Sequence, residues 1–229
     1  MDLNYVINPI AYIKSPFESK FGVPRQSGIT ESIISDIIFE PEYRNPTALR
    51  GLEGFSHIWL IWLFSESIEN GWSPTVRPPK LGGNKRMGVF ATRSPFRPNS
   101  LGLSCVKIEN INLSSPDGPV ISVSGADLID GTPIFDIKPY IPYSDSVPHA
   151  AAGFALNPER NRLNVKFSDS VTEVLPNELL SGLTEALEQD PRPAYQEDES
   201  RLYKMTYSGF DISFKVSDGC AFVENAVKL

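Results

Sequence analysis

The sequence predicts a mainly β protein, with an all-β barrel or sandwich over residues 1 to about 145 and a smaller α+β unit after it. Two observations support this prediction. Short runs rich in β-branched and aromatic residues alternate between apolar and polar positions, as in Val120–Ser124, which is the period of strands with one buried face. Twenty prolines and sixteen glycines interrupt the 229 residues, and both residue types disfavour long helices.

Seven strands and one short helix are expected in the first unit. The run Ile58–Phe64 is the longest apolar stretch, and seven residues are too few to cross a bilayer, so it is expected in the core. The helix is expected near Asn45–Leu52, where Gly51 and Gly54 would end it. The strands are expected at Tyr5–Lys14, Ile33–Phe39, His57–Phe64, Met87–Thr92, Leu103–Ile111, Val120–Gly125 and Ile134–Pro139.

The second unit follows a change of composition. From Tyr140 to Arg162 the chain is rich in Pro, Ala, Ser and Asn, which is typical of a linker over the surface. A strand at Leu163–Phe167, a helix at Asn177–Gln189 and three more strands are expected after it. Four leucines of the helix share one face, a stripe typical of core packing: Leu179, Leu180, Leu183 and Leu187. The domains are therefore expected at residues 1–148 and 163–229, with 149–162 as linker.

Composition indicates an ordinary globular protein of the cytoplasm. Cys105 and Cys220 both sit in apolar runs, and two cysteines in such settings predict buried reduced thiols rather than a disulfide scaffold. No N-terminal segment combines a charged start with an apolar core, so secretion is not expected. The net charge of −7 argues against nucleic-acid binding driven by overall charge.

Local charge departs from that overall balance. Between Asn70 and Ile108 the sequence has no Asp or Glu but seven basic residues, which are Arg77, Lys80, Lys85, Arg86, Arg93, Arg97 and Lys107. Only charges within roughly a Debye length, about 10 Å, act together, so a basic face can exist on an acidic protein. The block is also rich in Gly, Pro, Ser and Asn, which build fixed loops. It is expected to bind a polyanion or a zwitterionic ligand.

Several common kinds of site are excluded. His57 and His149 are the only histidines, and neither is near a cysteine or a carboxylate pair in sequence, so no metal site is expected. The sequence has no G-x-S-x-G elbow, no Walker A loop and no G-x-G-x-x-G after a strand, which excludes the usual serine hydrolase and Rossmann nucleotide sites.

Four loops remain as candidates. Arg93 and Arg97 lie four residues apart in a segment stiffened by two prolines. Such arginines suit carboxylate or phosphate recognition, and the alternative is a surface turn whose arginines form salt bridges. The others are Val23–Gln26, with a proline-fixed arginine; Asp127–Pro133, a turn whose first residue could accept ribose hydroxyls; and Asp190–Tyr195, in which two prolines hold an acid, a base and an aromatic residue for acid–base work or base stacking.

Four longer segments together resemble the TrmO family. They are RGLEGFSHIWLIWLF (50–64), PTVRPPKLGGNKRMGVFATRSPFRPNSLGLS (74–104), DLIDGTPIFDIKPYIPY (127–143) and DPRPAYQ (190–196). The resemblance covers nearly the whole chain in order. It implies a small N-terminal β-barrel with a C-terminal domain, and a homodimer with the methyl donor near the subunit interface. The implied activity is S-adenosylmethionine-dependent methylation of N6 of N6-threonylcarbamoyladenosine at position 37 of threonine tRNA.

The resemblance also assigns residues to the implied sites. The S-adenosylmethionine site would comprise Pro24, Arg25, Gln26, Ser65, Glu66, Arg93, Leu103, Asp127, Asp130, Gly131 and Thr132, with positions 65 and 66 acting through their backbone. The tRNA backbone would contact Lys80, Lys85, Arg86 and Arg97. Catalysis would involve Asp190 as general base, Arg192 as the group that holds the threonyl carboxylate or a phosphate, and Tyr195 as a stacking or hydrogen-bonding group.

Two alternatives stay open on sequence grounds. The chain could be an RNA- or nucleotide-binding module that keeps the fold without turnover, and such a module would tolerate changes at Asp190 and Tyr195. It could instead be a methyltransferase that acts on another acceptor. Consumption of the methyl donor separates the first alternative from an enzyme, and identification of the methylated product separates the second.

Overall fold

Six antiparallel strands between Ala11 and Pro139 close into a barrel, in the order β1-β2-β7-β6-β3-β8. The computed structural model describes residues 5–81, 83–155, 162–193 and 198–229. The closed sheet confirms the mainly β class and selects a barrel over a sandwich. Its strands are β1 (Ala11–Lys14), β2 (Ile34–Phe39), β3 (His57–Leu63), β6 (Leu101–Asn112), β7 (Val120–Ser124) and β8 (Pro133–Pro139).

The barrel interior follows the predicted alternation. Along β3, every second residue is buried, so Ile58, Leu60 and Trp62 face the core. Side chains from the other strands meet them there, including Ile37 and Val106. Strand β3 pairs with β6 on one side and with β8 on the other. Both edges of β3 are therefore paired within the sheet. The side chains at the end of β3 lie at one end of the barrel.

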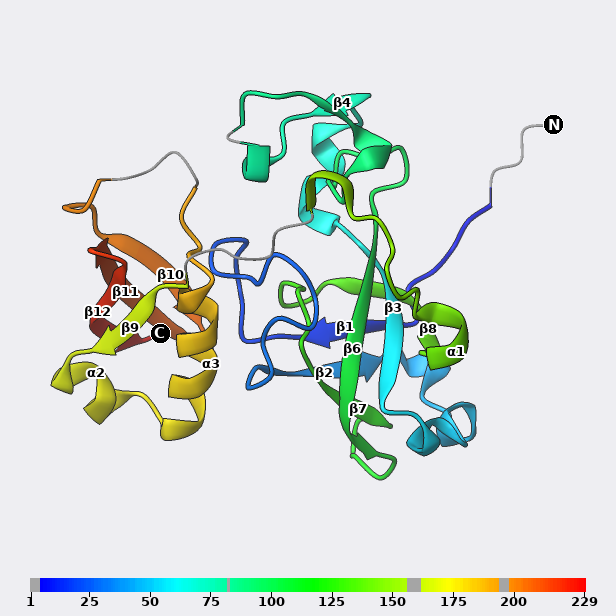
Figure 1. The fold of residues 1–229 in the computed structure, drawn as a ribbon. Coiled ribbons are helices and arrows are strands. Elements are labelled where there is room, and N and C mark those ends of the chain that lie inside the picture. Colours follow the sequence, from blue (N-terminus) through cyan, green and yellow to red (C-terminus); the bar gives the residue numbers. More distant parts are fainter. Residues whose placement is uncertain (1–4, 82, 156–161, 194–197) are drawn as a thin grey trace.

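An extension between β3 and β6 stands away from the barrel (Figure 1). It contains a two-stranded sheet of β4 (Thr75–Val76) and β5 (Met87–Gly88). The predicted strand Met87–Thr92 was wrong beyond Gly88, because the next residues form a 3-10 turn whose Thr92 backbone and hydroxyl both donate to the Val89 carbonyl. The short helices here are η4 (Ser65–Asn70), η5 (Pro79–Leu81) and η6 (Val89–Ala91).

Two other N-terminal elements differ from the prediction. Strand β1 begins at Ala11 instead of Tyr5, since Pro9 has no N–H for a ladder and the side chains of residues 5–9 are exposed. The predicted helix over Asn45–Leu52 is a pair of 3-10 turns. The remaining short helices are η1 (Pro41–Tyr43), η2 (Pro46–Leu49), η3 (Leu52–Gly54), α1 (Pro142–Asp145) and η7 (Gly153–Ala155).

The C-terminal unit is a four-stranded sheet in the order β10-β11-β12-β9, in which β9 runs parallel to β12. The leucine stripe of the predicted helix packs into its core with Leu183 and Leu187 fully buried. No helix in the described residues is long and apolar enough to cross a membrane. The elements are β9 (Asn164–Phe167), α2 (Asp169–Val174), α3 (Asn177–Glu188), β10 (Tyr203–Tyr207), β11 (Phe210–Ser217) and β12 (Cys220–Lys228).

The loop between β1 and β2 joins the two units. Phe17 and Ile33, at the two ends of this loop, are buried in the core of the C-terminal unit. Phe17 also pairs with Tyr207 of β10 as an isolated β-bridge, and their ring centroids are 5.5 Å apart. The Glu185 carboxylate on α3 accepts a 2.6 Å hydrogen bond from the Ser32 hydroxyl. The barrel and the C-terminal sheet are therefore packed together through the same loop.

Candidate functional site

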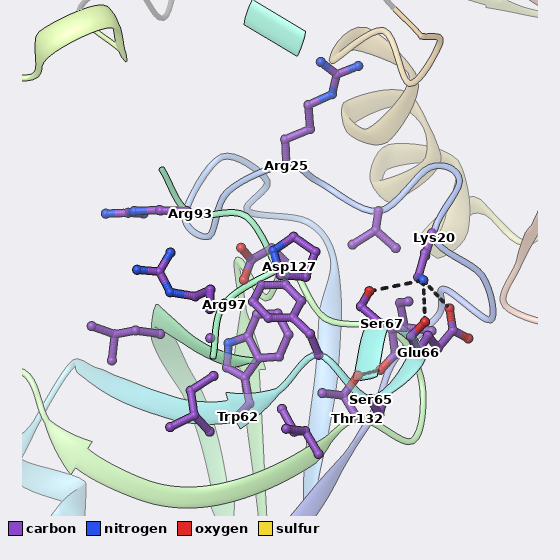
Figure 2. A pocket seen from close by; sticks show the side chains of 18 of the residues that line it. Lys20, Arg25, Trp62, Ser65, Glu66, Ser67, Arg93, Arg97, Asp127 and Thr132 are labelled. Carbon is purple, nitrogen blue, oxygen red and sulfur yellow. Dashed lines mark hydrogen bonds and ion pairs between the residues drawn. The ribbon is translucent and has the colours of Figure 1, made fainter. Parts of the chain in front are cut away.

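A cavity of about 570 Å³ lies where β3 ends and β6 begins. Loops from four parts of the chain surround it, and Figure 2 shows their side chains. The lining residues are Lys20, Val23, Pro24, Arg25, Gln26, Trp62, Leu63, Phe64, Ser65, Glu66, Ser67, Thr92, Arg93, Pro95, Arg97, Leu101, Gly102, Leu103, Asp127, Ile129 and Thr132. Nine of the eleven residues assigned to the methyl donor are among them, all except Asp130 and Gly131.

A chain of hydrogen bonds fixes the floor of the cavity. Trp62 Nε1 donates to Ser104 Oγ at 2.9 Å, and Ser104 Oγ donates to Asp127 Oδ1 at 2.5 Å. Gly102 is the cross-strand partner of Trp62, and the indole ring lies over the space that a side chain at position 102 would fill. Phe64 packs against the same ring with 4.3 Å between centroids. The floor thus combines aromatic faces with one carboxylate.

The surroundings of the Asp127 carboxylate act on its pKa in opposite directions. Burial raises its pKa, while the hydrogen bond from Ser104 and the positive charge of Arg93 lower it in part. A half-buried carboxylate at the bottom of a cavity can accept hydrogen bonds from hydroxyl or amino groups and can attract a cation. These are the groups of a nucleoside and of a sulfonium or ammonium ion.

Arg93 and Arg97 do not act as one fork. Arg93 is exposed, and its Nη1 donates to Gln26 Oε1 at 2.6 Å. Arg97 Nη1 donates to the Thr92 carbonyl at 2.7 Å, and its guanidinium lies 5.8 Å from the centroid of the Phe90 ring. Arg97 therefore stiffens the loop that carries Arg93, while also lining the cavity. The sequence had grouped Arg97 with the tRNA contacts instead.

Lys20 forms the opposite wall and was missed by sequence reasoning. Its Nζ donates to the Glu66 carbonyl at 2.9 Å and to Ser67 Oγ at 3.4 Å, and it forms a 3.5 Å ion pair with Glu66 Oε2. Figure 2 shows these contacts as dashed lines. A signal existed, because Lys20 precedes the recognised Pro24 by four residues in the same loop. Trp62 was also missed, since its apolar run indicated only core.

Some residues of the turn after Asp127 attach it to β1, and another lines the cavity. Asp130 Oδ1 accepts a hydrogen bond from the Ser15 backbone at 2.8 Å, and the Gly131 N–H donates to the Ile13 carbonyl at 2.8 Å. Gly131 has a φ of 73°, a conformation that glycine adopts without steric cost. Both residues thus tie the turn to β1. Thr132 is buried and lines the cavity, with its hydroxyl donating to the Ile129 carbonyl at 2.6 Å.

The catalytic candidates lie just beyond α3. Asp190 accepts from Arg192 through both carboxylate oxygens, with Arg192 Nε to Oδ1 at 2.8 Å and Nη2 to Oδ2 at 2.9 Å. This pair raises the pKa of Arg192. Arg25, on the cavity rim, donates to the Arg192 carbonyl at 3.0 Å and to the Asp190 carbonyl at 3.4 Å. The structure therefore connects this segment to the cavity, and Tyr195 lies outside the described residues.

The remaining basic candidates are on the extension. Lys85 and Arg86 are exposed, and Arg86 Nη1 donates to Thr75 Oγ1 at 3.2 Å across the β4–β5 pair. Lys80 belongs to η5, and its side chain is outside the described part of the structure. Among the described residues, no three His, Cys, Asp or Glu side chains are grouped in a way that could hold a metal ion.

Comparisons with known proteins agree with this architecture. The family model of the tRNA-methyltransferase O N-terminal domain matches residues 12–146, and that of the TrmO C-terminal domain matches residues 160–229. An Escherichia coli (strain K12) relative named tRNA (adenine(37)-N6)-methyltransferase is 40% identical over 94% of each chain. A Pseudomonas aeruginosa relative, 39% identical over 92% of each chain, is named for S-adenosylmethionine-dependent methyl transfer. A crystal structure of TrmO superposes with a TM-score of 0.80 at 31% identity, covering 98% of this chain and 100% of that chain. The chain therefore belongs to the tRNA-methyltransferase O (TrmO) family.

Proposed function

We propose that the chain transfers a methyl group from S-adenosylmethionine to N6 of N6-threonylcarbamoyladenosine at position 37 of threonine tRNA in the cytoplasm. The observation that carries this proposal is the cavity at the mouth of the barrel, in which a half-buried carboxylate and aromatic faces meet cationic side chains. The cavity would hold the donor within residues 1–148. The segment that begins at Asp190 would meet the acceptor from residues 163–229.

The cavity residues fit the donor. A volume of about 570 Å³ lies within the range of about 300–1,000 Å³ usual for small-molecule sites. The Phe64 ring, which is only partly buried, suits contact with an adenine ring or a sulfonium cation, and the buried Trp62 ring packs against it. The Asp127 carboxylate suits ribose hydroxyls or the amino group of the methionyl part, and Arg93 or Lys20 suits its carboxylate. When bound, the donor supplies an electrophilic methyl group on sulfur.

The acceptor explains why the protein would need a base. N6 of threonylcarbamoyladenosine is part of a urea, so its lone pair is delocalised and the nitrogen is a poor nucleophile while it carries its proton. Most of the rate of an in-line methyl transfer can come from positioning the two reactants. Removal of the N–H proton during transfer would supply the rest, and Asp190 is the candidate acceptor for that proton.

The Asp190–Arg192 pair sets a condition on this role. Both oxygens of Asp190 accept hydrogen bonds from Arg192, so a proton could reach only the lone pairs that this pair leaves open. The threonyl carboxylate of the substrate is itself a bidentate partner for a guanidinium. We infer that it takes the place of Asp190 on Arg192, which would free the Asp190 carboxylate only when the correct nucleoside is present. Tyr195 would stack on the base or donate a hydrogen bond to it.

The extension supports the choice of a large anionic substrate and a second subunit. Lys85 and Arg86 are exposed on it, where they would follow the phosphates of the anticodon loop. The same extension exposes large apolar side chains at Ile68, Trp72 and Phe90, with 51%, 59% and 75% of their surface accessible. Exposed large apolar side chains on one extension support a homodimer, and sedimentation analysis of the purified chain would test the subunit number.

Mass spectrometry of a defined reaction tests the proposal. Threonine tRNA carrying threonylcarbamoyladenosine is incubated with the purified protein and isotope-labelled S-adenosylmethionine, and its nucleosides are then analysed. We expect the modified nucleoside to gain one labelled methyl group at N6. A matched tRNA with unmodified adenosine at position 37 is expected to gain none.

Other outcomes would select the alternatives. Methylation of the unmodified control would show that the threonylcarbamoyl group does not define the acceptor. Donor binding by calorimetry without methylation of either tRNA would favour a binding module or a different acceptor. Absence of donor binding would contradict the assignment of the cavity.

A further inference from the structure

Arg25 lies on the rim of the cavity, but its guanidinium points away from the cavity. Figure 2 shows the guanidinium directed away from Trp62 and Asp127 and toward the segment that follows α3. There its Nη2 donates to the Arg192 carbonyl at 3.0 Å and to the Asp190 carbonyl at 3.4 Å. The loop between β1 and β2 is thereby bonded to a segment about 165 residues away in sequence. An arginine that only held the donor would point inward.

The segment that Arg25 contacts is itself rigid. Asp190 adopts a φ of 49°, and its N–H donates to the Leu187 carbonyl at 3.0 Å, which ends α3 with a left-handed residue. Pro191 and Pro193 fix their own φ angles. The bidentate Asp190–Arg192 pair holds the side chains on top of this turn. Because so few degrees of freedom remain, a contact at the two carbonyls sets the position of the whole segment.

On its other side Arg25 is connected to the cavity wall. Gln26 Nε2 donates to the Arg25 carbonyl at 2.6 Å, and Gln26 Oε1 accepts from Arg93 Nη1 at 2.6 Å. A continuous set of hydrogen bonds thus runs from Arg93, through Gln26 and Arg25, to the carbonyls of Asp190 and Arg192. It joins three loops that sequence reasoning had singled out separately.

We propose that Arg25 is a positioning residue that places the segment 190–193 over the filled cavity, so that donor binding and acceptor engagement are coupled. This proposal rests on the proposed function, since the segment is taken as the part that meets the acceptor. A ligand that contacts Arg93 would restrict the motion of Arg93 and Gln26. The hydrogen bonds from Arg25 to the segment 190–193 would then be more stable. By linkage, an acceptor that fixes the segment tightens donor binding by the same factor.

Hydrogen exchange tests the coupling without any tRNA. Pro191 and Pro193 have no N–H, so the segment 190–193 reports through the amides of Asp190 and Arg192 alone. We expect S-adenosylmethionine to slow the exchange of these two amides in the wild-type protein. The effect is expected to vanish in Arg25→Ala and to survive in part in Arg25→Lys, because an ammonium can donate to a carbonyl without the planar fork of a guanidinium. Arg50→Ala, which removes an exposed arginine elsewhere, is the matched control.

Kinetics then separate positioning from donor binding. With Arg25→Ala we expect kcat on modified tRNA to fall about 100-fold, the size of effect that a small misplacement of reactants produces. The dissociation constant for S-adenosylmethionine without tRNA is expected to change by less than about threefold. A wild-type kcat with donor affinity weakened about tenfold or more would make Arg25 a donor ligand and overturn the proposal.

The two measurements also distinguish this proposal from the proposed function. If the wild-type protein methylates no threonylcarbamoyl tRNA but its 190–193 amides respond to the donor through Arg25, the substrate assignment is wrong and the coupling stands. If the tRNA is methylated while the amides exchange equally with and without donor, the coupling is wrong and the function stands. Absence of donor binding to the wild-type protein would overturn both.

Discussion

Replacing Gly102 with alanine should deform the floor of the cavity. A Cβ at this position would lie 2.2 Å from Trp62 Cε2, 2.4 Å from Cζ2 and 2.6 Å from Cδ2. Carbon atoms in contact are about 3.5–4.0 Å apart, so the ring must move by roughly 1 Å or more. The ring has little freedom to do so, because its Nε1 donates a hydrogen bond to Ser104 and Phe64 packs against it.

The expected cost follows from these contacts. Overpacking of a filled core costs about 1–3 kcal/mol, and loss of the buried bond from Trp62 to Ser104 adds about 1–3 kcal/mol. A ring that shifts along the Nε1–Oγ direction keeps part of this hydrogen bond, so the two costs do not add in full. We therefore expect Gly102→Ala to lower the free energy of unfolding by about 2–4 kcal/mol. Donor affinity should fall about tenfold or more, which is about 1.4 kcal/mol, since Ser104 also orients Asp127.

Urea denaturation measures the first effect and titration calorimetry with S-adenosylmethionine the second. Gly54→Ala is the matched control, because a Cβ there meets nothing within 4 Å and its φ is not positive. Trp62→Phe adds a second test, since the smaller ring leaves room for the alanine methyl. The double variant should therefore lose less than the sum of the single ones. A Gly102→Ala protein within about 0.5 kcal/mol of wild type, with unchanged donor affinity, would refute this account of the floor.

Three further predictions address charge. Asp127→Asn should weaken donor binding about tenfold. Burial raises the pKa of Asp127 in the folded protein, so the folded state loses stability relative to the unfolded state as the pH rises from the unfolded pKa, about 3.9, through the folded pKa. Urea unfolding should therefore show the variant more stable than wild type at neutral pH, and a variant less stable there would contradict the sign. Asp190→Asn should lower kcat at saturating tRNA about 100-fold or more if this carboxylate takes the proton, and near-wild-type turnover would remove it as the base. Lys85→Glu with Arg86→Glu should weaken tRNA binding and flatten the dependence of log K on log salt by about one unit per lost phosphate contact, whereas Lys228→Glu should change neither; equal slopes in all three proteins would count against the extension as the RNA face.

The barrel could be predicted because its signal is local. Strands β3 and β7 begin where the sequence predicted and end within one residue of the expected position. Alternation identified β7, whereas β3 was found as a continuous apolar run, which does not show which of its faces is buried. The errors came where the outcome depends on partners. Residues 5–9 have strand-like side chains but stand before the first ladder contact of β1, and residues 89–91 turn because Thr92 bonds back to Val89. Period-2 patterning does not report either event.

The candidate site could be predicted from the sequence where prolines restrict the loops that carry its residues. The loops at Pro24–Gln26 and Arg93–Arg97 were found from proline-fixed arginines, and both line the cavity. Their partners were not predictable, because the bond from Arg93 to Gln26 joins residues 67 positions apart. Trp62 gave no functional signal, since an aromatic residue in an apolar run is usually core. Only closure of the barrel places the last inward side chain of β3 at an open end.

The position of the cavity follows from how the loop between β1 and β2 is anchored. Its two ends, at Phe17 and Ile33, are buried in the C-terminal core, while its middle supplies Lys20 and Arg25 to the cavity at the barrel mouth. The C-terminal core therefore cannot form without also placing the cavity wall. The proposed donor site on the barrel and the proposed acceptor segment after α3 would otherwise depend on a linker for their distance. The shared loop makes that distance a property of the folded core, which is what a transfer between two separately bound reactants requires.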